Sequence, residues 1–327
     1  MTIYDIARMA GVSASTVSRV MNNREGISSR TREKVMEVIR NENFCASDTA
    51  RSLSTQYSST IGILVADIRN QHHIEGAYMI AQRFLPLGYC SLLLNTGYEK
   101  ESMVECIRTL STRRISGLVL IGSIFQNSEV EEALKSFVCD IPVVFQNGEL
   151  DLPNLSSAVS RDDEGTADAV RFLYGKGRRT IAFVNNNDTP SNRKKMAGYR
   201  NAVSQLGLKS IIIPECEDSA EGGEKAAEKL IEAEPGVDGI IFSVDLIAAG
   251  GMRKLLSLGR RIPEDIAILG TDNSSCCTLT TPMLSSIDTR LPELSAACFD
   301  ILKAEIGQKQ GRKNVSFECR IVERQTT

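Results

Sequence analysis

The spacing of hydrophobic residues at the start of the chain is typical of two short helices joined by a tight turn. Apolar side chains recur at helical spacing over residues 3–10, and Gly11 then interrupts the pattern. Ser13 offers an N-cap oxygen to a second helix that contains Val17. Ala7, Gly11 and Val17 supply a small contact residue, a permissive turn residue and a branched core residue. This spacing predicts a helix-turn-helix.

A third amphipathic helix, from about Thr31 to Asn41, completes the predicted three-helix core, and Phe44 can close it. Ser47 is a candidate cap for a further short helix at about residues 47–54. The serine-rich stretch from Ser52 to Thr60 indicates a linker. We therefore expect an all-α head at residues 1–57 and a separate body at residues 58–327.

From Thr60 the pattern changes to short apolar runs that alternate with helical stretches. This alternation favours a parallel sheet covered by helices, and it repeats after Ser160. The fold class that we predict is an all-α helix-turn-helix head plus an α/β body of two doubly wound parallel-sheet subdomains. The predicted strands are residues 61–66, 91–94, 117–121 and 143–145 in the first half, and 180–184, 210–213, 239–242 and 266–269 in the second.

The tail reads as one more helix, from Leu291 to Ile306, and one more strand, from Val315 to Val322. No third domain is left for them to join, so we expect them to return to the first half. The subdomains would then comprise residues 61–160 plus 291–320, and residues 161–289. A cleft between two such halves is the expected ligand site, because ligands bind beyond the carboxyl ends of parallel strands.

Charge and composition narrow the function classes. The net charge is −3, yet residues 1–60 carry eight Arg or Lys against six Asp or Glu, a basic head on an acidic body that favours a nucleic-acid partner. No apolar run reaches the roughly 20 residues of a membrane span, and the N-terminus is unlike a secretion signal, so we expect a cytoplasmic protein without a membrane partner. The nine cysteines include no C-x-x-C pair, which argues against a disulfide framework.

Polar side chains gather where the predicted strands of the body end. Carboxylates and amides that converge on a cleft suit a small polyol or sugar, although each one is also a candidate helix N-cap. We expect Asp67, Asn147 and Asp245 to contact such a ligand. The other strand-end residues are Asn95, Ser123, Gln146, Asn185 to Asn187, Ser243, Asp272 and Asn273.

The segments TIYDIARMAGVSASTVSRVMNN, SSRTREKVMEVI and ARSL closely resemble the DNA-binding head of the lactose and galactose repressor (LacI/GalR) family of bacterial transcription regulators. In the body, IPEDIAILGTDNS and VSFECRIVERQ are also family-like. The resemblance implies a homodimeric regulator, expected to be a repressor, that binds pseudo-palindromic operator DNA and is modulated by a small effector. The DNA-contacting positions that it implies are Tyr4, Ala14, Ser15, Thr16, Arg19, Asn22, Ser28, Ala50 and Leu53, with Leu53 as a minor-groove wedge.

For the body, the resemblance implies a fold similar to periplasmic sugar-binding proteins, with three chain crossings near Ser160, at residues 288–292 and in the final strand. It assigns effector contacts to Asp272 and to Lys195, which stands where many members have Arg. No Trp is present to stack on a pyranose, and Tyr98, Phe125 and Phe145 are alternative aromatic walls or core residues.

Other chemistries receive less support. The chain lacks G-x-S-x-G, H-E-x-x-H, G-x-x-x-x-G-K-[ST] and G-x-G-x-x-G motifs, so we expect neither an enzyme nor a cofactor. His72 and His73 are the two histidines, and we expect loop residues near the cleft rather than a metal site. The family's catabolite control proteins bind a phosphorylated carrier protein through an Arg and a Lys, where this chain has Asp300 and Ala304. We therefore expect no such co-repressor, because Asp300 would repel a phosphoserine.

Overall fold

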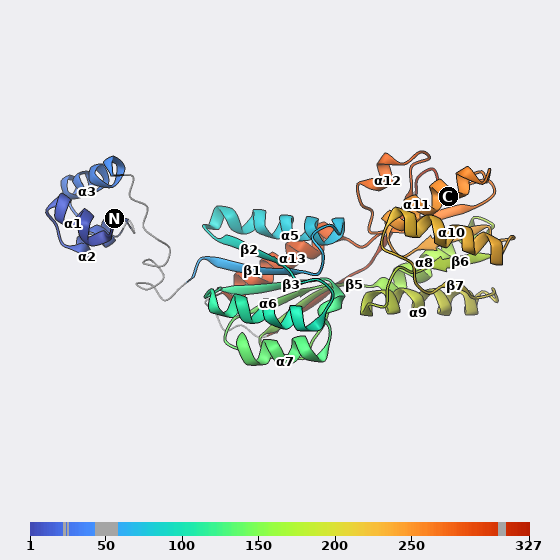
Figure 1. Cartoon of the computed structure of the whole chain (residues 1–327), viewed down its shortest axis with the longest axis horizontal. Helices are drawn as coiled ribbons and strands as arrows, with labels where there is room; N and C mark the ends of the chain where they lie inside the picture. Colours follow the sequence, from blue (N-terminus) through green and yellow to red (C-terminus); the bar gives the residue numbers. More distant parts are fainter. Residues whose placement is uncertain (22–23, 25, 43–57, 307–311) are drawn as a thin grey trace. The chain divides into compact units, whose positions relative to one another are not determined.

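A computed structural model describes residues 1–21, 24, 26–42, 58–306 and 312–327 in two compact units, Met1–Ser59 and Thr60–Thr327 (Figure 1). We describe each unit by itself. In this described part of the chain, no helix is both long and apolar enough to cross a membrane. The predicted helix at residues 47–54, and with it Phe44, Ala50 and Leu53, lies outside the described residues.

The head unit contains three helices, α1 (Ile3–Ala10), α2 (Ala14–Met21) and α3 (Ser29–Asn41). Thr2 and Asp5 form a capping box at the start of α1, and Gly11 ends the helix at φ 62°, a left-handed conformation that glycine adopts without strain. The apolar stripes of the three helices meet in one core, as predicted. Its fully buried members are Ile6, Ala7, Ala10, Val17, Val20 and Val35.

The body unit contains two six-stranded sheets, each covered by helices on both faces. The first sheet has the order β11-β5-β4-β3-β1-β2 and is parallel throughout. Its strands are β1 (Thr60–Val65), β2 (Cys90–Asn95), β3 (Gly117–Ile121), β4 (Val143–Gln146), β5 (Leu155–Ser160) and β11 (Asn314–Phe317). The helices are α5 (Gln71–Phe84) and α13 (Leu291–Glu305) on one face and α6 (Lys100–Thr112) and α7 (Ser128–Phe137) on the other, with short 3₁₀ turns η1 (Leu85–Leu87) and η2 (Ser123–Phe125).

The second sheet has the order β12-β10-β9-β8-β6-β7, and β12 pairs with β10 antiparallel. Its strands are β6 (Ile181–Val184), β7 (Ile211–Ile213), β8 (Gly239–Phe242), β9 (Ala267–Thr271), β10 (Ser285–Asp288) and β12 (Arg320–Val322). Helices α8 (Asp162–Gly175) and α9 (Pro190–Gln205) cover one face; α10 (Ala220–Ala233), α11 (Asp245–Ser257) and α12 (Cys276–Leu279) cover the other. The predicted fold class is confirmed, with the helical head and two parallel sheets, of which the second carries one antiparallel edge strand.

The chain passes between the two sheets three times, after Ser160, between β10 and α13, and between β11 and β12. The expectation of one continuous strand from Val315 to Val322 is wrong. Asn314–Phe317 pairs with β5 of the first sheet, whereas Arg320–Val322 pairs with β10 of the second. A single strand cannot serve both sheets, so the chain leaves one sheet at Glu318 and Cys319 and enters the other.

Two strands, β5 and β10, have no counterpart among the predicted strands because serines occupy much of them. LSSAVS and SSID lack a long apolar run, yet both segments are almost entirely buried. Their hydroxyls find internal partners: Ser156 Oγ donates to Glu305 Oε1 at 2.6 Å, and Ser286 Oγ donates to Asp245 Oδ1 at 2.6 Å. A buried serine that is hydrogen-bonded in this way costs little, so a central strand tolerates it.

Candidate functional site

The second helix of the head presents a polar face. Ser13 Oγ accepts a hydrogen bond from Thr16 N at 3.2 Å, so Ser13 caps α2 as predicted. Ser15 and Arg19 are exposed, and Tyr4 on α1 is 73% exposed. Guanidinium and hydroxyl groups on an exposed helix are the side chains that read base edges in a major groove.

Three other predicted DNA contacts have structural roles in the head. Ala14 is partly buried and packs against the head core, so its methyl group lies at the edge of the polar face. Thr16 Oγ1 is 2.9 Å from Ser13 Oγ, and Ser28 caps α3 by accepting from Thr31 N at 3.2 Å. Asn22 lies outside the described residues. The hydroxyls therefore sit at helix N-termini, which are favourable places for phosphate.

The body contains a cavity whose walls come from both halves. Of the predicted effector residues, Asn147, Lys195 and Asp272 line it. Direct contacts join the halves beside it: Ser191 N donates to Ser123 Oγ at 3.0 Å, and His72 Nδ1 lies 3.6 Å from Asp272 Oδ1. Further lining residues are Asn70, His73, Tyr98, Gln146, Asn186, Asn187, Asn192 and Asp218. The cavity therefore mixes amides, carboxylates, imidazoles and one ammonium group.

Two of the predicted effector residues have strained backbones. Asn147 has φ 60° and Asp272 has φ 100°, in the region that residues with a side chain rarely adopt. Such conformations cost about 1–3 kcal/mol each and persist where the surroundings hold them, frequently at ligand sites. The strain marks Asn147 and Asp272 as positions held in place for their side-chain direction.

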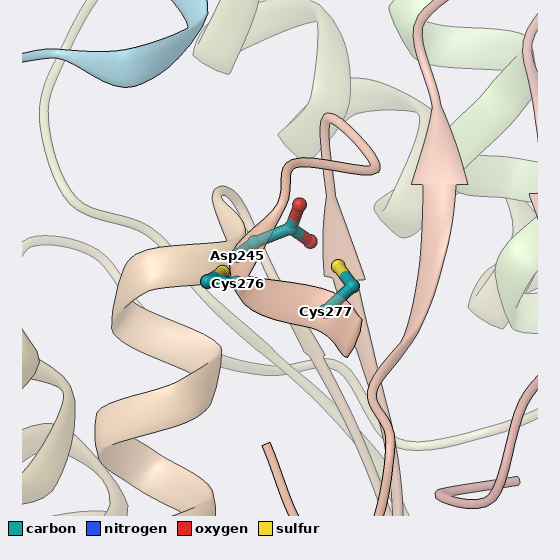
Figure 2. Close-up of side chains that lie close together, drawn as sticks. All are labelled: Asp245, Cys276 and Cys277. Atoms are coloured by element: carbon teal, nitrogen blue, oxygen red, sulfur yellow. The ribbon is translucent and has the colours of Figure 1, made fainter. Parts of the chain in front are cut away.

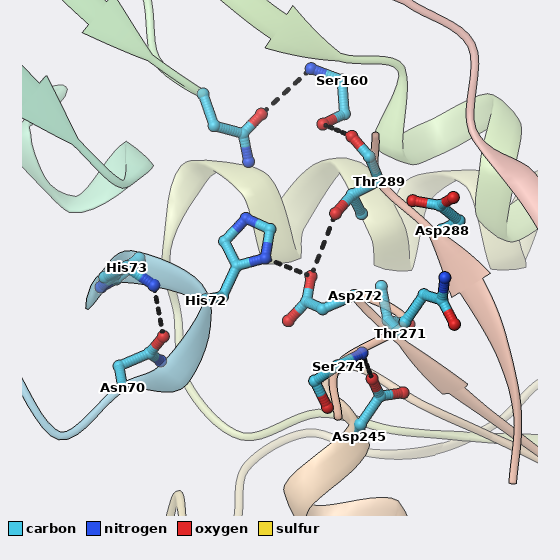
Figure 3. Close-up of polar contacts among 12 residues, drawn as sticks. Asn70, His72, His73, Ser160, Asp245, Thr271, Asp272, Ser274, Asp288 and Thr289 are labelled. Carbon is cyan, nitrogen blue, oxygen red and sulfur yellow. Dashed lines mark hydrogen bonds and ion pairs between the residues drawn. The ribbon is translucent and has the colours of Figure 1, made fainter. Parts of the chain in front are cut away.

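A chain of hydrogen bonds connects these two residues through two of the crossings. Ser160 N donates to Asn147 Oδ1 at 3.2 Å, and Ser160 Oγ donates to the Thr289 carbonyl oxygen at 3.0 Å. Thr289 Oγ1 then donates to Asp272 Oδ1 at 3.4 Å, and the same carboxylate oxygen faces His72 Nδ1 (Figure 3). Because Ser160 and Thr289 lie where the chain passes between the halves, the lining of the cavity is tied directly to the crossings.

Lys195 is buried and donates from Nζ to the Ser243 carbonyl oxygen at 2.9 Å. Burial raises the pKa of the nearby Asp162, and the positive charge of Lys195 opposes that rise. Asn192, also on α9, donates from Nδ2 to Asn186 Oδ1 and Asn187 Oδ1, both at 2.7 Å. Helix α9 thus fixes an ammonium group and a cluster of amides at the cavity wall.

His73 presents an edge to the cavity, but its Nδ1 is buried and has no hydrogen-bond partner in the described part of the chain. Burial lowers its pKa to about 4, with a smaller contribution from His72, so the imidazole is neutral at pH 7. Both histidines lie in the first turn of α5, which Asn70 caps by accepting from His73 N at 3.1 Å. The prediction that His72 and His73 are loop residues is therefore wrong, although both lie beside the cleft as expected.

Two predicted effector residues do not line the cavity. Asp67 forms an ion pair with Arg69 at 2.7 Å, and this partner lowers the pKa of Asp67. Asp245 is 1% exposed and accepts from Ser286 Oγ at 2.6 Å. It also accepts from Ser274 N at 2.7 Å (Figure 3). Both follow strands, as predicted, but local partners hold their carboxylates away from the cavity.

Sequence reasoning missed several lining residues. Asn192 lies inside a helix and Asp218 lies beyond β7 in a loop, so neither directly follows a strand end. Asn70 is the N-cap of α5, a position that carries no signal of a ligand contact. Among the aromatic candidates, Tyr98 lines the cavity, whereas Phe125 and Phe145 are fully buried in the core of the first half.

The chain matches two family models and several known proteins. The family model described as "Bacterial regulatory proteins, lacI family" matches residues 2–47, and that of a "Periplasmic binding protein-like domain" matches residues 170–327. Catabolite control protein A of Priestia megaterium is 30% identical over 306 residues, covering 92% of this chain and 91% of that protein. The HTH-type transcriptional repressor PurR of Vibrio atlanticus is 30% identical over 334 residues, covering 99% and 98%.

Among solved structures, the lac repressor dimer bound to operator and the anti-inducer ONPF superimposes with a TM-score of 0.90 at 24% identity, covering 100% of this chain and 98% of that one. This likeness confirms the fold of both units.

Proposed function

The chain belongs to the lacI family of bacterial regulatory proteins, and we propose that it is a homodimer that binds a pseudo-palindromic operator. Binding of a small hydroxylated ligand in the body cavity then lowers or raises the protein's affinity for the operator. It is a DNA-binding transcription regulator and not an enzyme. Operator DNA of a bacterium lies in the cytoplasm, and we place the protein there.

On the DNA side, the proposal assigns base reading to Ser15 and Arg19 on α2. Tyr4, Thr16 and Ser28 supply hydroxyls for phosphates, and Ala14 supplies a methyl group at the edge of the reading face. The basic head supports this assignment, because phosphate contacts supply most non-specific affinity. Asn22, Ala50 and Leu53 keep the roles that the family resemblance implies.

On the ligand side, the single observation that carries the proposal is the cavity lined by residues of both halves, Asn147 from one and Lys195 and Asp272 from the other. Amides donate and accept, carboxylates accept, and an ammonium donates, a set that pairs with vicinal hydroxyls of a sugar or polyol. A ligand that bridges the halves binds one cleft geometry better than another, and only such a difference in affinity shifts the equilibrium.

The homodimer receives support from exposed apolar side chains on the body. Tyr78, Leu85 and Leu87 follow one another along α5 and η1 and are 63%, 61% and 46% exposed. Exposed apolar groups of this kind mark interaction surfaces when they cluster. A twofold dimer would present two heads to two half-sites.

Selection of bound duplexes from a randomised pool at a stated salt concentration tests the DNA side. We expect the wild type to recover a pseudo-palindrome, and Arg19→Ala to relax the preference at one base pair per half-site by about 1–3 kcal/mol. Recovery of no sequence preference, with and without a metabolite pool, would contradict operator binding.

Thermal-shift screening of sugars and polyols tests the ligand side, with Asp272→Asn as the variant. The ligand should raise the unfolding temperature of the wild type and have a much smaller effect on the variant. Asp67→Asn is the matched control, because Asp67 also follows a strand but does not line the cavity. An equal response in Asp272→Asn would exclude that carboxylate as a ligand contact.

A further inference from the structure

A cluster of three metal-ligating side chains lies outside the cavity. Asp245 begins α11, and Cys276 and Cys277 begin α12 (Figure 2). A carboxylate oxygen and the two Sγ atoms all lie within 4.8 Å of one another. Asp245 and Cys277 are buried, and Cys276 is half-buried. Cys276 therefore offers the cluster a side that solvent reaches.

The carboxylate of this cluster has no cationic partner. Ser286 Oγ and Ser274 N both donate to it, but among the residues that the structure describes no Lys, Arg or His forms an ion pair with it. Asp245 is 1% exposed, so solvent does little to compensate a charge there. A buried carboxylate without a counter-ion is costly, and a bound cation removes that cost.

Ser274 links the carboxylate of the cluster to its more accessible thiol. Cys276 Sγ lies 3.0 Å from Ser274 Oγ, and the backbone N of Ser274 donates to Asp245 Oδ2 at 2.7 Å. Metal ions bind the deprotonated sulfur of a cysteine, and their binding displaces the thiol proton.

A disulfide between the two cysteines fits the geometry less well. Their α-carbons are neighbours across one trans peptide, about 3.8 Å apart, whereas disulfides usually span about 4.4–6.8 Å between α-carbons. The helical turn at Cys276–Leu279 would have to open to form the bond. The three candidate ligand atoms, by contrast, already lie within 4.8 Å of one another.

We propose that Asp245, Cys276 and Cys277 bind one thiophilic divalent cation of the Zn²⁺ class, with two thiolates and one carboxylate oxygen as protein ligands and water in the fourth position. Two sulfurs and one oxygen are a ligand set that such ions accept in tetrahedral coordination, and soft thiolates disfavour Mg²⁺ and Ca²⁺. Neither C-x-x-C spacing nor a histidine cluster marks this site in the sequence, because its ligands come from an adjacent cysteine pair and a distant aspartate.

The proposed site adjoins the segment that carries Asp272. Residues 272–275 connect β9 to α12, and the backbone N of Ser274 already donates to Asp245. A bound ion would join α11 to α12 and hold this segment. Metal occupancy would therefore stiffen the wall of the cavity where Asp272 stands, which goes beyond the function proposed above.

The test uses the full-length chain, reduced and freed of metal by a chelator, and titrates it with Co²⁺ while absorption is recorded. We expect one equivalent of Co²⁺ with sulfur-to-metal charge-transfer and tetrahedral visible bands, and displacement by one equivalent of Zn²⁺. Loss of a residue that only supports a metal ligand typically weakens binding about 10–100-fold. Because Cys276 is itself a ligand in the proposed site, Cys276→Ser should weaken Zn²⁺ binding by more than that. Cys90→Ser, at an exposed cysteine on β2, is the matched control and should bind as the wild type does.

Absence of charge-transfer bands, or binding unchanged in Cys276→Ser, would overturn the proposal. Binding lost in Cys90→Ser and kept in Cys276→Ser would also overturn it, by moving the site elsewhere. Asp245→Asn adds a further measurement, with circular dichroism to check its fold. If that variant does not fold, Cys276→Ser decides, because its half-buried side chain makes the milder change.

Discussion

At the scale of single residues, His73 gives the body a defined response to acid. Its pKa is about 4 in the folded chain, whereas that of an unperturbed imidazole is 6.5. Above pH 6.5 the imidazole is neutral in both states and has no effect. Between pH 6.5 and 4 the unfolded chain binds a proton that the folded chain does not, so the free energy of unfolding falls, by at most about 3 kcal/mol.

We predict that His73→Gln removes this loss. Urea unfolding at pH 7 and at pH 4.5 should show a smaller difference for the variant than for the wild type. Asp162 and Asp218 have raised pKa values and act in the opposite direction, so the comparison between variant and wild type is the readout. Parallel curves for the two proteins would show that His73 does not titrate as described.

The predicted effector residues show how far residue-level reasoning reaches. Asn147 and Asp272 follow strands and line the cavity, as expected for strand ends of a parallel sheet that meet at one edge. Lys195 also lines it, but it lies within α9, and only the family resemblance indicated it. Asp67 and Asp245 satisfy the same rule, yet each has a nearer partner, Arg69 for the first and two serine-derived donors for the second. Position along the chain predicts where a side chain begins but not which partner it takes.

At the scale of elements, the N-cap of α2 links the fold of the head to its affinity for DNA. Ser13 Oγ accepts from Thr16 N and lies 2.8 Å from Ser15 Oγ, so one side chain orders both the helix start and a base-reading residue. We predict that Ser13→Ala weakens operator binding by about 1 kcal/mol, roughly fivefold, in titrations at fixed salt. Ser13→Thr keeps a capping hydroxyl and should lose less. Equal losses in the two variants would show that the capping hydroxyl is not what supports binding.

Elements with a regular apolar pattern were predictable, and those without one were not. The third helix of the head, the helix from Leu291 and the apolar strands of both sheets agree with their predicted bounds within a few residues. In β5 and β10, hydrogen bonds to distant groups such as Glu305 and Thr327 make buried serines acceptable, and no local pattern reports such partners. The break between β11 and β12 likewise depends on which sheet each segment meets.

At the scale of the whole molecule, the hydrogen bonds through Ser160 and Thr289 offer a route from the cavity to the crossings. We predict that Ser160→Ala, which removes the bond to the Thr289 carbonyl oxygen, changes the coupling between ligand and operator by about 0.5–2 kcal/mol. The measurement is the ratio of operator dissociation constants with and without the ligand found by screening. Ser257→Ala, on α11, removes an exposed hydroxyl as a control, and an equal change there would deny Ser160 a specific role.

The exposed residues Tyr78 and Leu85 allow the dimer to be tested separately from the DNA face. If these side chains are covered by a second copy of the chain, a glutamate there places a charge in an apolar contact, and the dimer dissociates. A monomer reaches one half-site, so we predict that Tyr78→Glu with Leu85→Glu weakens binding to the full palindrome more than tenfold, about 1.4 kcal/mol or above. Affinity for a single half-site should be unchanged.

Light scattering reports the mass, and DNA titration reports both affinities. Arg83→Glu, on the same helix, changes charge without removing apolar surface, and it should leave the dimer intact. Dimers that persist in the double variant would place the contact on another face, such as that of Leu279, which is 81% exposed. Neither the double variant nor Arg83→Glu alters the head. A loss of affinity that is confined to the full palindrome can therefore arise only from the contact between two copies.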